Sequence, residues 1–171
     1  MSELEAKAVL EALRELRPAL GLAPKAARSP ELSKRIRALS LADGGAPLAL
    51  RSALLLWNGE LDASHELSQD IHTPTGSLLH GIMHRMEGDY GNAEYWFRRV
   101  GTHPCYRAIG AAAGGIAGDG AWDPYRFNRA VERAVRSGDA AAAAPLANAQ
   151  HVELDVVTTY CFDQAFRRAS H

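Results

Sequence analysis

The chain has 171 residues, of which 47% are hydrophobic and 23% charged, so it is long enough for one domain with a substantial core. Its formal net charge of -1 gives no overall attraction to nucleic acid or to an anionic membrane. No stretch approaches the roughly 20 uninterrupted apolar residues of a membrane span, and the charged N-terminus lacks the apolar segment of a secretion signal.

Helical periodicity dominates the first part of the chain. Apolar residues at helical spacing predict a first helix over residues 2–20, and a loop over 21–28 follows it. Ser29-Pro30 predicts the start of a second helix, because a proline in the first helical position has no N–H that needs a partner. After a break at 43–45, the nearly continuous apolar segment 47–57 predicts a buried helix.

The last part of the chain is also predicted to be helical. Asp123-Pro124 repeats the start signal and predicts a helix to about residue 137. A final long helix is predicted from about Pro145 to residue 168, since its apolar residues keep helical spacing. No segment of the sequence has the alternating pattern that would make a convincing strand.

The two cysteines, Cys105 and Cys161, do not form a disulfide framework. They also lack the spacing of a zinc knuckle or of a redox pair. We therefore expect two reduced, mostly buried thiols in a cytoplasmic protein.

Glycine followed by an acidic residue recurs at Gly59-Glu60, Gly88-Asp89, Gly118-Asp119 and Gly138-Asp139. Glycine readily takes the left-handed conformation that ends a helix. An acidic residue then favours the positively charged start of the next helix. Each pair therefore predicts a turn between two helices.

The segments around the first two pairs match each other in pattern. Apolar and small residues lie at the same spacing before and after both glycines, which predicts stacked helical hairpins over about 47–72 and 74–104. The matched positions before the glycines are Leu50, Ala53, Leu54 and Trp57 in the first segment and Leu79, Ile82, Met83 and Met86 in the second.

The second hairpin resembles tetratricopeptide hairpins, in which small residues let two helices approach closely. The residues that carry this resemblance are Gly81, Gly88, Tyr90, Ala93, Phe97 and Pro104. The first hairpin departs from the pattern, because Ser52 stands at the place of Gly81 and Ser68 at the place of Phe97. The resemblance implies a stack of helices with a binding role, and it implies no catalytic residue.

A wider resemblance covers LDASHELSQDI, the segment 76–104 and AWDPYRF downstream. Together these stretches are similar to an uncharacterised family of soluble bacterial and fungal proteins, which implies one domain and no particular activity. The sequence thus predicts an all-α fold, a single domain over residues 1–171. We expect about eight or nine helices in stacked antiparallel hairpins, with a tetratricopeptide-like centre.

His80 and His84 are four residues apart on the first helix of the second hairpin, so they project from the same side. This side lies roughly opposite the apolar face of the helix. Two histidines at this spacing can supply two ligands to a divalent transition metal. However, HGIMH lacks the glutamate of the metalloprotease motif. The pair can equally face solvent, pack against another hairpin, or contact an organic ligand or an anion.

His65 is the candidate third ligand. It lies with Asp62 and Gln69 along one stripe of the preceding hairpin, and Asp62 can orient a histidine. Glu66 is available as a ligand on the same grounds, so the ligand set stays open at this point. A solvated stripe is the alternative interpretation.

Arg98 and Arg99 end the second hairpin, and His103 follows them. Guanidinium groups suit the recognition of carboxylate or phosphate. Arginines at this place also complement a helix dipole or form ion pairs with acidic residues of the same hairpin.

We expect the candidate site residues to converge on one polar groove rich in histidine and arginine. The residues of this groove are His65, His80, His84, Arg98, Arg99 and His103. One hypothesis is a helical binding or interaction domain for a small anion or a protein partner. The other is a metal-dependent enzyme such as a hydrolase, with three histidines as ligands and arginine as an anion clamp. The sequence assigns no catalytic residue and leaves both hypotheses open.

Overall fold

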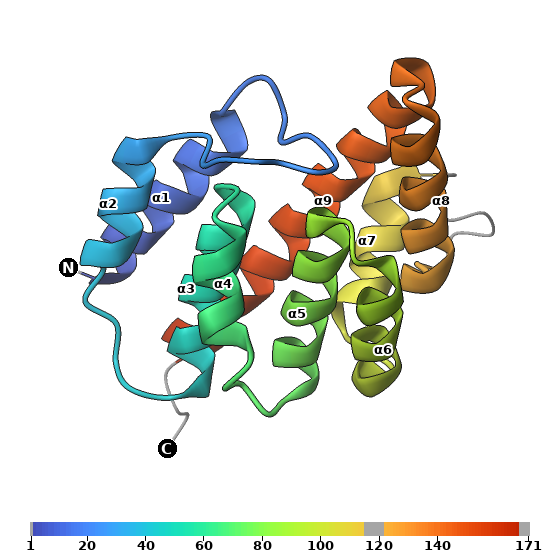
Figure 1. Cartoon of the computed structure of the whole chain (residues 1–171). Coiled ribbons are helices and arrows are strands. Elements are labelled where there is room, and N and C mark those ends of the chain that lie inside the picture. The colour runs from blue at the N-terminus through green and yellow to red at the C-terminus, as the bar shows by residue number, and fades with distance from the viewer. Residues whose placement is uncertain (1, 115–121, 168–171) are drawn as a thin grey trace.

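The computed structural model of the protein describes residues 2–114 and 122–167, and all regular structure in these segments is helical (Figure 1), which confirms the all-α prediction. The helices are α1 (Ser2–Glu15), α2 (Pro30–Ala38), α3 (Gly45–Trp57), α4 (Leu61–Ser68), α5 (Pro74–Glu87), α6 (Tyr90–Val100), α7 (Cys105–Ala113), α8 (Pro124–Ser137) and α9 (Ala140–Phe166). Within the described segments, no helix combines the length and the apolar character that crossing a membrane requires.

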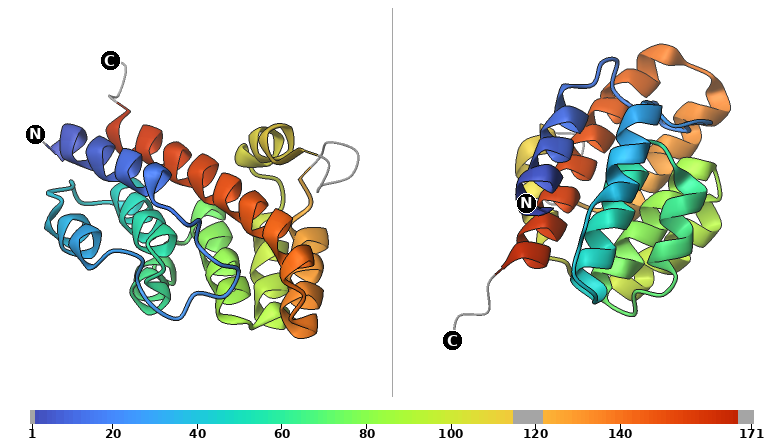
Figure 2. Two further views of the ribbon diagram at one scale, coloured as in Figure 1. Left: turned by 90° about the horizontal axis from the view of Figure 1, so that it is seen from above. Right: turned by 90° about the vertical axis from the view of Figure 1, so that its left-hand side faces the viewer.

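Two helical hairpins form the centre of the fold. Helix α3 packs against α4 and α5 packs against α6, while contacts of α3 and α4 with α5 hold the hairpins side by side. The long helix α9 crosses behind this layer and contacts α1, α3, α7 and α8 (Figure 1). Figure 2 shows α1 lying alongside the C-terminal part of α9. One continuous cluster of buried apolar side chains connects the two hairpins with α9.

The glycine–acidic pairs that the structure describes form turns between helices, as predicted. Gly59, Gly88 and Gly138 have φ angles of 86°, 96° and 66°, in the left-handed region that favours glycine. Asp89 and Asp139 then accept hydrogen bonds from backbone N–H groups in the first turns of α6 and α9. These carboxylates satisfy donors that a helix start leaves without partners.

Two predicted boundaries differ from the structure. Helix α1 ends at Glu15 rather than near residue 20, because Pro18 disfavours helical conformation in the residue before it. Helix α9 begins at Ala140, before the predicted start at Pro145, because Asp139 caps a run of alanines that strongly favours helix. The predicted turn at Gly118-Asp119 lies outside the described residues.

Gly81 on α5 provides the surface on which Phe97 of α6 lies. A Cβ atom at Gly81 would be 2.6 Å from the Phe97 ring, closer than real Cβ contacts allow. Phe97 is 1% exposed and Ala93, one turn earlier on α6, is 0% exposed. The small and large residues singled out in the sequence thus set how closely α5 and α6 approach.

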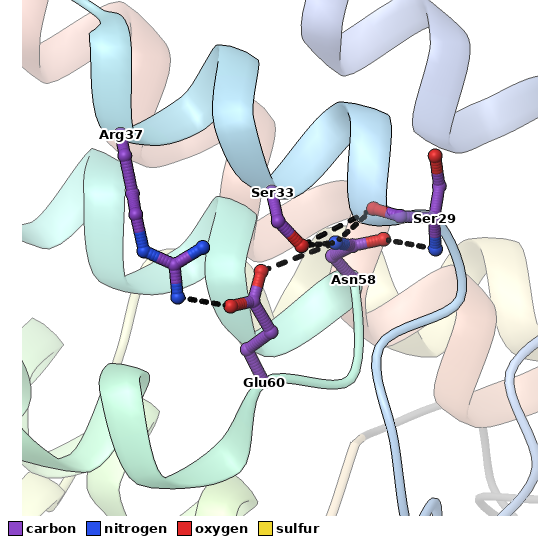
Figure 3. Close-up of polar contacts among 5 residues, drawn as sticks. All are labelled: Ser29, Ser33, Arg37, Asn58 and Glu60. Carbon is purple, nitrogen blue, oxygen red and sulfur yellow. Dashed lines mark hydrogen bonds and ion pairs between the residues drawn. The ribbon is translucent and has the colours of Figure 1, made fainter.

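A hydrogen-bond network centred on Asn58 joins α2 to the turn between α3 and α4 (Figure 3). The buried Asn58 side chain accepts from the Ser29 N–H at 3.2 Å and donates to the Ser33 hydroxyl at 3.0 Å. It also donates to Glu60, which in turn pairs with Arg37 of α2. Because each polar atom here has a partner, the network fixes α2 against the first hairpin without leaving a buried group unsatisfied.

Candidate functional site

Three histidines from neighbouring hairpins lie together. His65 belongs to α4, while His80 and His84 lie one turn apart on α5. The ring centroid of His65 is 4.6 Å from that of His80 and 5.4 Å from that of His84, and the His80 and His84 centroids are 4.8 Å apart. One nitrogen from each ring can be chosen so that all three lie within 4.8 Å of one another.

The cluster lies beneath the surface, between α4, α5 and α6. His80 is 3% exposed and His84 is 6% exposed, whereas His65 is partly exposed. The Trp96 indole of α6 stacks on the His80 ring with centroids 3.9 Å apart and planes tilted by 16°. The side of α5 opposite its main apolar face is therefore covered by the second helix of its own hairpin and by α4.

His80 is held in its neutral form. Burial is the main cause that lowers its pKa to about 4, and the nearby His84 and His65 lower it further. Its Nδ1 atom is buried and has no hydrogen-bond partner among the described residues. A neutral imidazole with an unused nitrogen is the form that binds a metal ion.

This pKa predicts a loss of stability in acid for the metal-free protein. The unfolded chain binds a proton on His80 near pH 6.5, whereas the folded chain does so only near pH 4. The free energy of unfolding should therefore fall as the pH falls through this window, by on the order of 2–3 kcal/mol from this one group. Urea unfolding at pH 7 and pH 4.5 in the presence of a chelator measures the difference.

The matched variants are His80→Phe, which keeps a ring on Trp96 but does not titrate, and His72→Gln at an exposed position. His80→Phe should reduce the pH dependence and His72→Gln should leave it unchanged. An equal pH dependence in wild type and His80→Phe would contradict the prediction.

His84 is oriented by contacts at both of its ring nitrogens. The Asn92 amide nitrogen of α6 lies 3.1 Å from Nε2 and donates to it, so the ring proton is on Nδ1. That proton is donated to the carboxylate of Glu87, one turn further along α5. A carboxylate on the far nitrogen of a histidine is a common support for a metal ligand, because it fixes the tautomer and makes the ligand nitrogen more basic.

The structure spreads the other predicted site residues over different places. Arg99 lies on the outer side of the cluster, with its guanidinium carbon 5.3 Å from the centre of the Trp96 ring. Arg98 is exposed on the same helix. His103 lies just before α7, where it contacts Thr75 and the Tyr160 ring. The histidines of α4 and α5 therefore come together, and Arg99 approaches them only through Trp96.

A polar cavity of about 430 Å³ adjoins the histidine cluster through Glu87. Asp62 of α4 and Lys25 of the long loop before α2 also line it, as do Gly59 and Glu60, which contacts Asn58. Glu87 is thus shared, since it accepts the His84 proton and faces a space large enough for a small molecule.

Sequence reasoning missed three contributors to this site. Trp96 shares a helix face with apolar residues and is expected in the core, yet its ring covers His80. Asn92 carries no motif that marks it. Glu87 lies three residues after His84, and this spacing on a helix is a signal that identifies the pair. Glu94, which is available to the arginines of the same hairpin, instead pairs with Arg129 of α8.

A scan against protein-family models found no match, and searches of curated proteins and of solved structures found none either. The resemblances to tetratricopeptide hairpins and to the bacterial and fungal family therefore stay predictions. The geometry of the site carries the functional argument.

Proposed function

We propose that the chain is a transition-metal-binding domain in which His65, His80 and His84 are the protein ligands. The observation that carries this proposal is that one nitrogen of each of three histidines lies within 4.8 Å of the others. Two of these rings are buried, and one has a free, neutral nitrogen. Imidazole ligands suit zinc, copper, nickel and iron, and not magnesium or calcium.

Metal binding requires a small closure of the cluster. Nitrogen ligands lie about 2.0–2.1 Å from zinc, which places them about 3.3 Å apart in a tetrahedral site. The present spread of up to 4.8 Å therefore shrinks by about 1.5 Å on binding. His65 can supply this movement because it is only partly buried, on the short helix α4. The Asn92 amide leaves Nε2 of His84, while Glu87 keeps Nδ1.

Zinc titration tests the proposal. Protein purified without a histidine tag should bind one zinc per chain, and saturating zinc should raise the melting temperature. At a free zinc concentration of 100 times the dissociation constant, the stabilisation is about 2.7 kcal/mol. His80→Phe should abolish both effects, and His72→Gln, which changes an exposed histidine outside the cluster, should retain them. Wild-type protein that neither binds zinc, nickel or copper nor gains stability from them would refute the proposal.

The supporting carboxylate gives a second test. Glu87→Gln keeps the size of the side chain but removes the charge that orients His84. We expect zinc affinity to fall about 10- to 100-fold, as loss of a supporting hydrogen bond to a ligand histidine typically causes. Glu66→Gln is the matched control, because Glu66 is an exposed residue on α4 next to His65. If Glu66→Gln weakens zinc binding more than Glu87→Gln, Glu66 and not Glu87 acts at the site.

A metal-dependent hydrolase is the second candidate, and the cavity beside Glu87 favours it. Three protein ligands leave one coordination position open, as in catalytic zinc sites, and a bound water there would have a lowered pKa. Wild type and His80→Phe can be compared, with zinc added to both, for hydrolysis of p-nitrophenyl acetate and p-nitrophenyl phosphate. Equal rates for the two proteins would leave binding without catalysis as the proposed role.

A further inference from the structure

A second cavity lies at the opposite end of α5 from His84. It has a volume of about 370 Å³, within the range of small-molecule sites. It lies between the first turns of α3 and α5, residues 102–104 just before α7, and the C-terminal half of α9. Its walls are largely apolar, and they include Ala46, Ala49, Pro74 and Pro104. Thr75 and His84 are nine positions apart on the helix, which corresponds to about 13 Å, so this cavity is separate from the histidine cluster.

The direction of the hydrogen bonds at this cavity can be assigned. The backbone N–H of Cys105 donates to Nδ1 of His103 at 3.2 Å, so this nitrogen carries no proton. His103 is 6% exposed and burial lowers its pKa, which keeps the ring neutral with its proton on Nε2. Nε2 lies 3.1 Å from the Thr75 hydroxyl oxygen and therefore donates to it.

This assignment leaves the hydrogen of the Thr75 hydroxyl free. No other hydrogen bond of this hydroxyl is found within residues 2–114 and 122–167, and Thr75 lines the cavity. Gly45 and Ala46 also line the cavity, and their backbone N–H groups lie at the start of α3, which has no side-chain cap. Apart from the neutral His103, the described residues that line the cavity have no acidic or basic side chain, so no charged side chain among them repels an anion or pairs with a cation.

We propose that this cavity binds a small apolar carboxylic acid, with the carboxylate accepting the Thr75 hydroxyl and the hydrocarbon part lying on the alanine and proline walls. The Thr75 hydroxyl offers a donor, and the first turns of α3 and α5 carry the partial positive charge of helix starts, so a negatively charged acceptor fits the cavity better than an amine does. The carboxylate is favoured over a neutral alcohol because an ionised acceptor forms the stronger hydrogen bond. This site and the histidine cluster share no lining residue, so each proposal stands or fails alone.

Three probes with the same chain and different head groups test the ligand class. Isothermal titration and thermal melting with octanoate, octanol and octylamine should show the tightest binding for octanoate, about 10-fold weaker binding for octanol, and none for octylamine. Thr75→Val should reduce octanoate binding to the level of octanol, whereas Thr75→Ser, which keeps the hydroxyl, should bind as wild type.

A second variant guards against an effect of Thr75→Val on folding. Ala46→Trp fills the cavity from the partly exposed first turn of α3 and should abolish binding of octanoate and octanol alike. Absence of octanoate binding in the wild type at millimolar concentration would overturn the proposal. Equal affinity for octanoate and octylamine, or unchanged octanoate binding in Ala46→Trp, would also overturn the proposal.

Discussion

Replacing Glu153 by leucine should lower the free energy of unfolding by about 3–5 kcal/mol, because it leaves a buried arginine without its counter-charge. Arg85 of α5 and Glu153 of α9 are both 0% exposed. Their side chains form a two-pronged ion pair, one contact of which is 3.2 Å long. In Glu153→Leu, the partners that remain to the guanidinium among the described residues are the Gln150 amide oxygen at 3.3 Å and the Phe127 ring, whose centre is 4.7 Å away.

The double variant Arg85→Met/Glu153→Leu is the control that isolates the unpaired charge. Replacing both partners of a buried pair with apolar residues is often close to neutral, because the desolvation cost of both charges disappears. We therefore expect the double variant to be more stable than Glu153→Leu in urea unfolding at pH 7. A double variant that is less stable than Glu153→Leu would contradict this expectation, because it would mean that Arg85 without its counter-charge still stabilises the protein through Gln150 and Phe127.

The parts of the fold that could be predicted are those fixed by residues close together in the sequence. The turns at Gly59, Gly88 and Gly138 depend on residues adjacent in sequence, and the φ angles bear them out. Helix start signals at Ser29-Pro30 and Asp123-Pro124 depend on the same kind of local chemistry, and both side chains cap their helices as expected. The end of α1 and the start of α9 are predicted less well, the latter because Pro145, taken as the first residue of the helix, lies inside it.

The proximity of His65 to His80 and His84 could be anticipated, because a repeated hairpin brings equivalent faces of neighbouring helices together. The side chains that contact these histidines could not be anticipated from the sequence. Trp96 lies on His80 only because α6 crosses α5 at a particular angle, which no local pattern specifies. Arg85 is a core residue only because Glu153, 68 positions away, lies opposite it. Such contacts depend on the tertiary arrangement of α9 over the hairpins.

The contact between the two helices of the second hairpin gives the other large expected effect. Phe97→Ala should lower the free energy of unfolding by about 3–5 kcal/mol, because Phe97 is 1% exposed and its removal leaves a cavity over Gly81. Tyr95→Ala is the matched control on the same helix. Tyr95 is 46% exposed, so its loss should change stability by no more than about 0.5 kcal/mol.

A double-mutant cycle with Gly81 identifies the cause of that effect. Gly81→Ala alone should destabilise the protein, because the new Cβ lies 2.6 Å from the Phe97 ring. In Phe97→Ala the ring is gone, so the same methyl group fills part of the cavity and should cost less or become favourable. We expect the two changes to couple by about 0.5–3 kcal/mol in urea unfolding. Additive effects would mean that Phe97 stabilises the protein through contacts other than the one with Gly81, such as the one with the Tyr125 ring, whose centroid is 6.3 Å away.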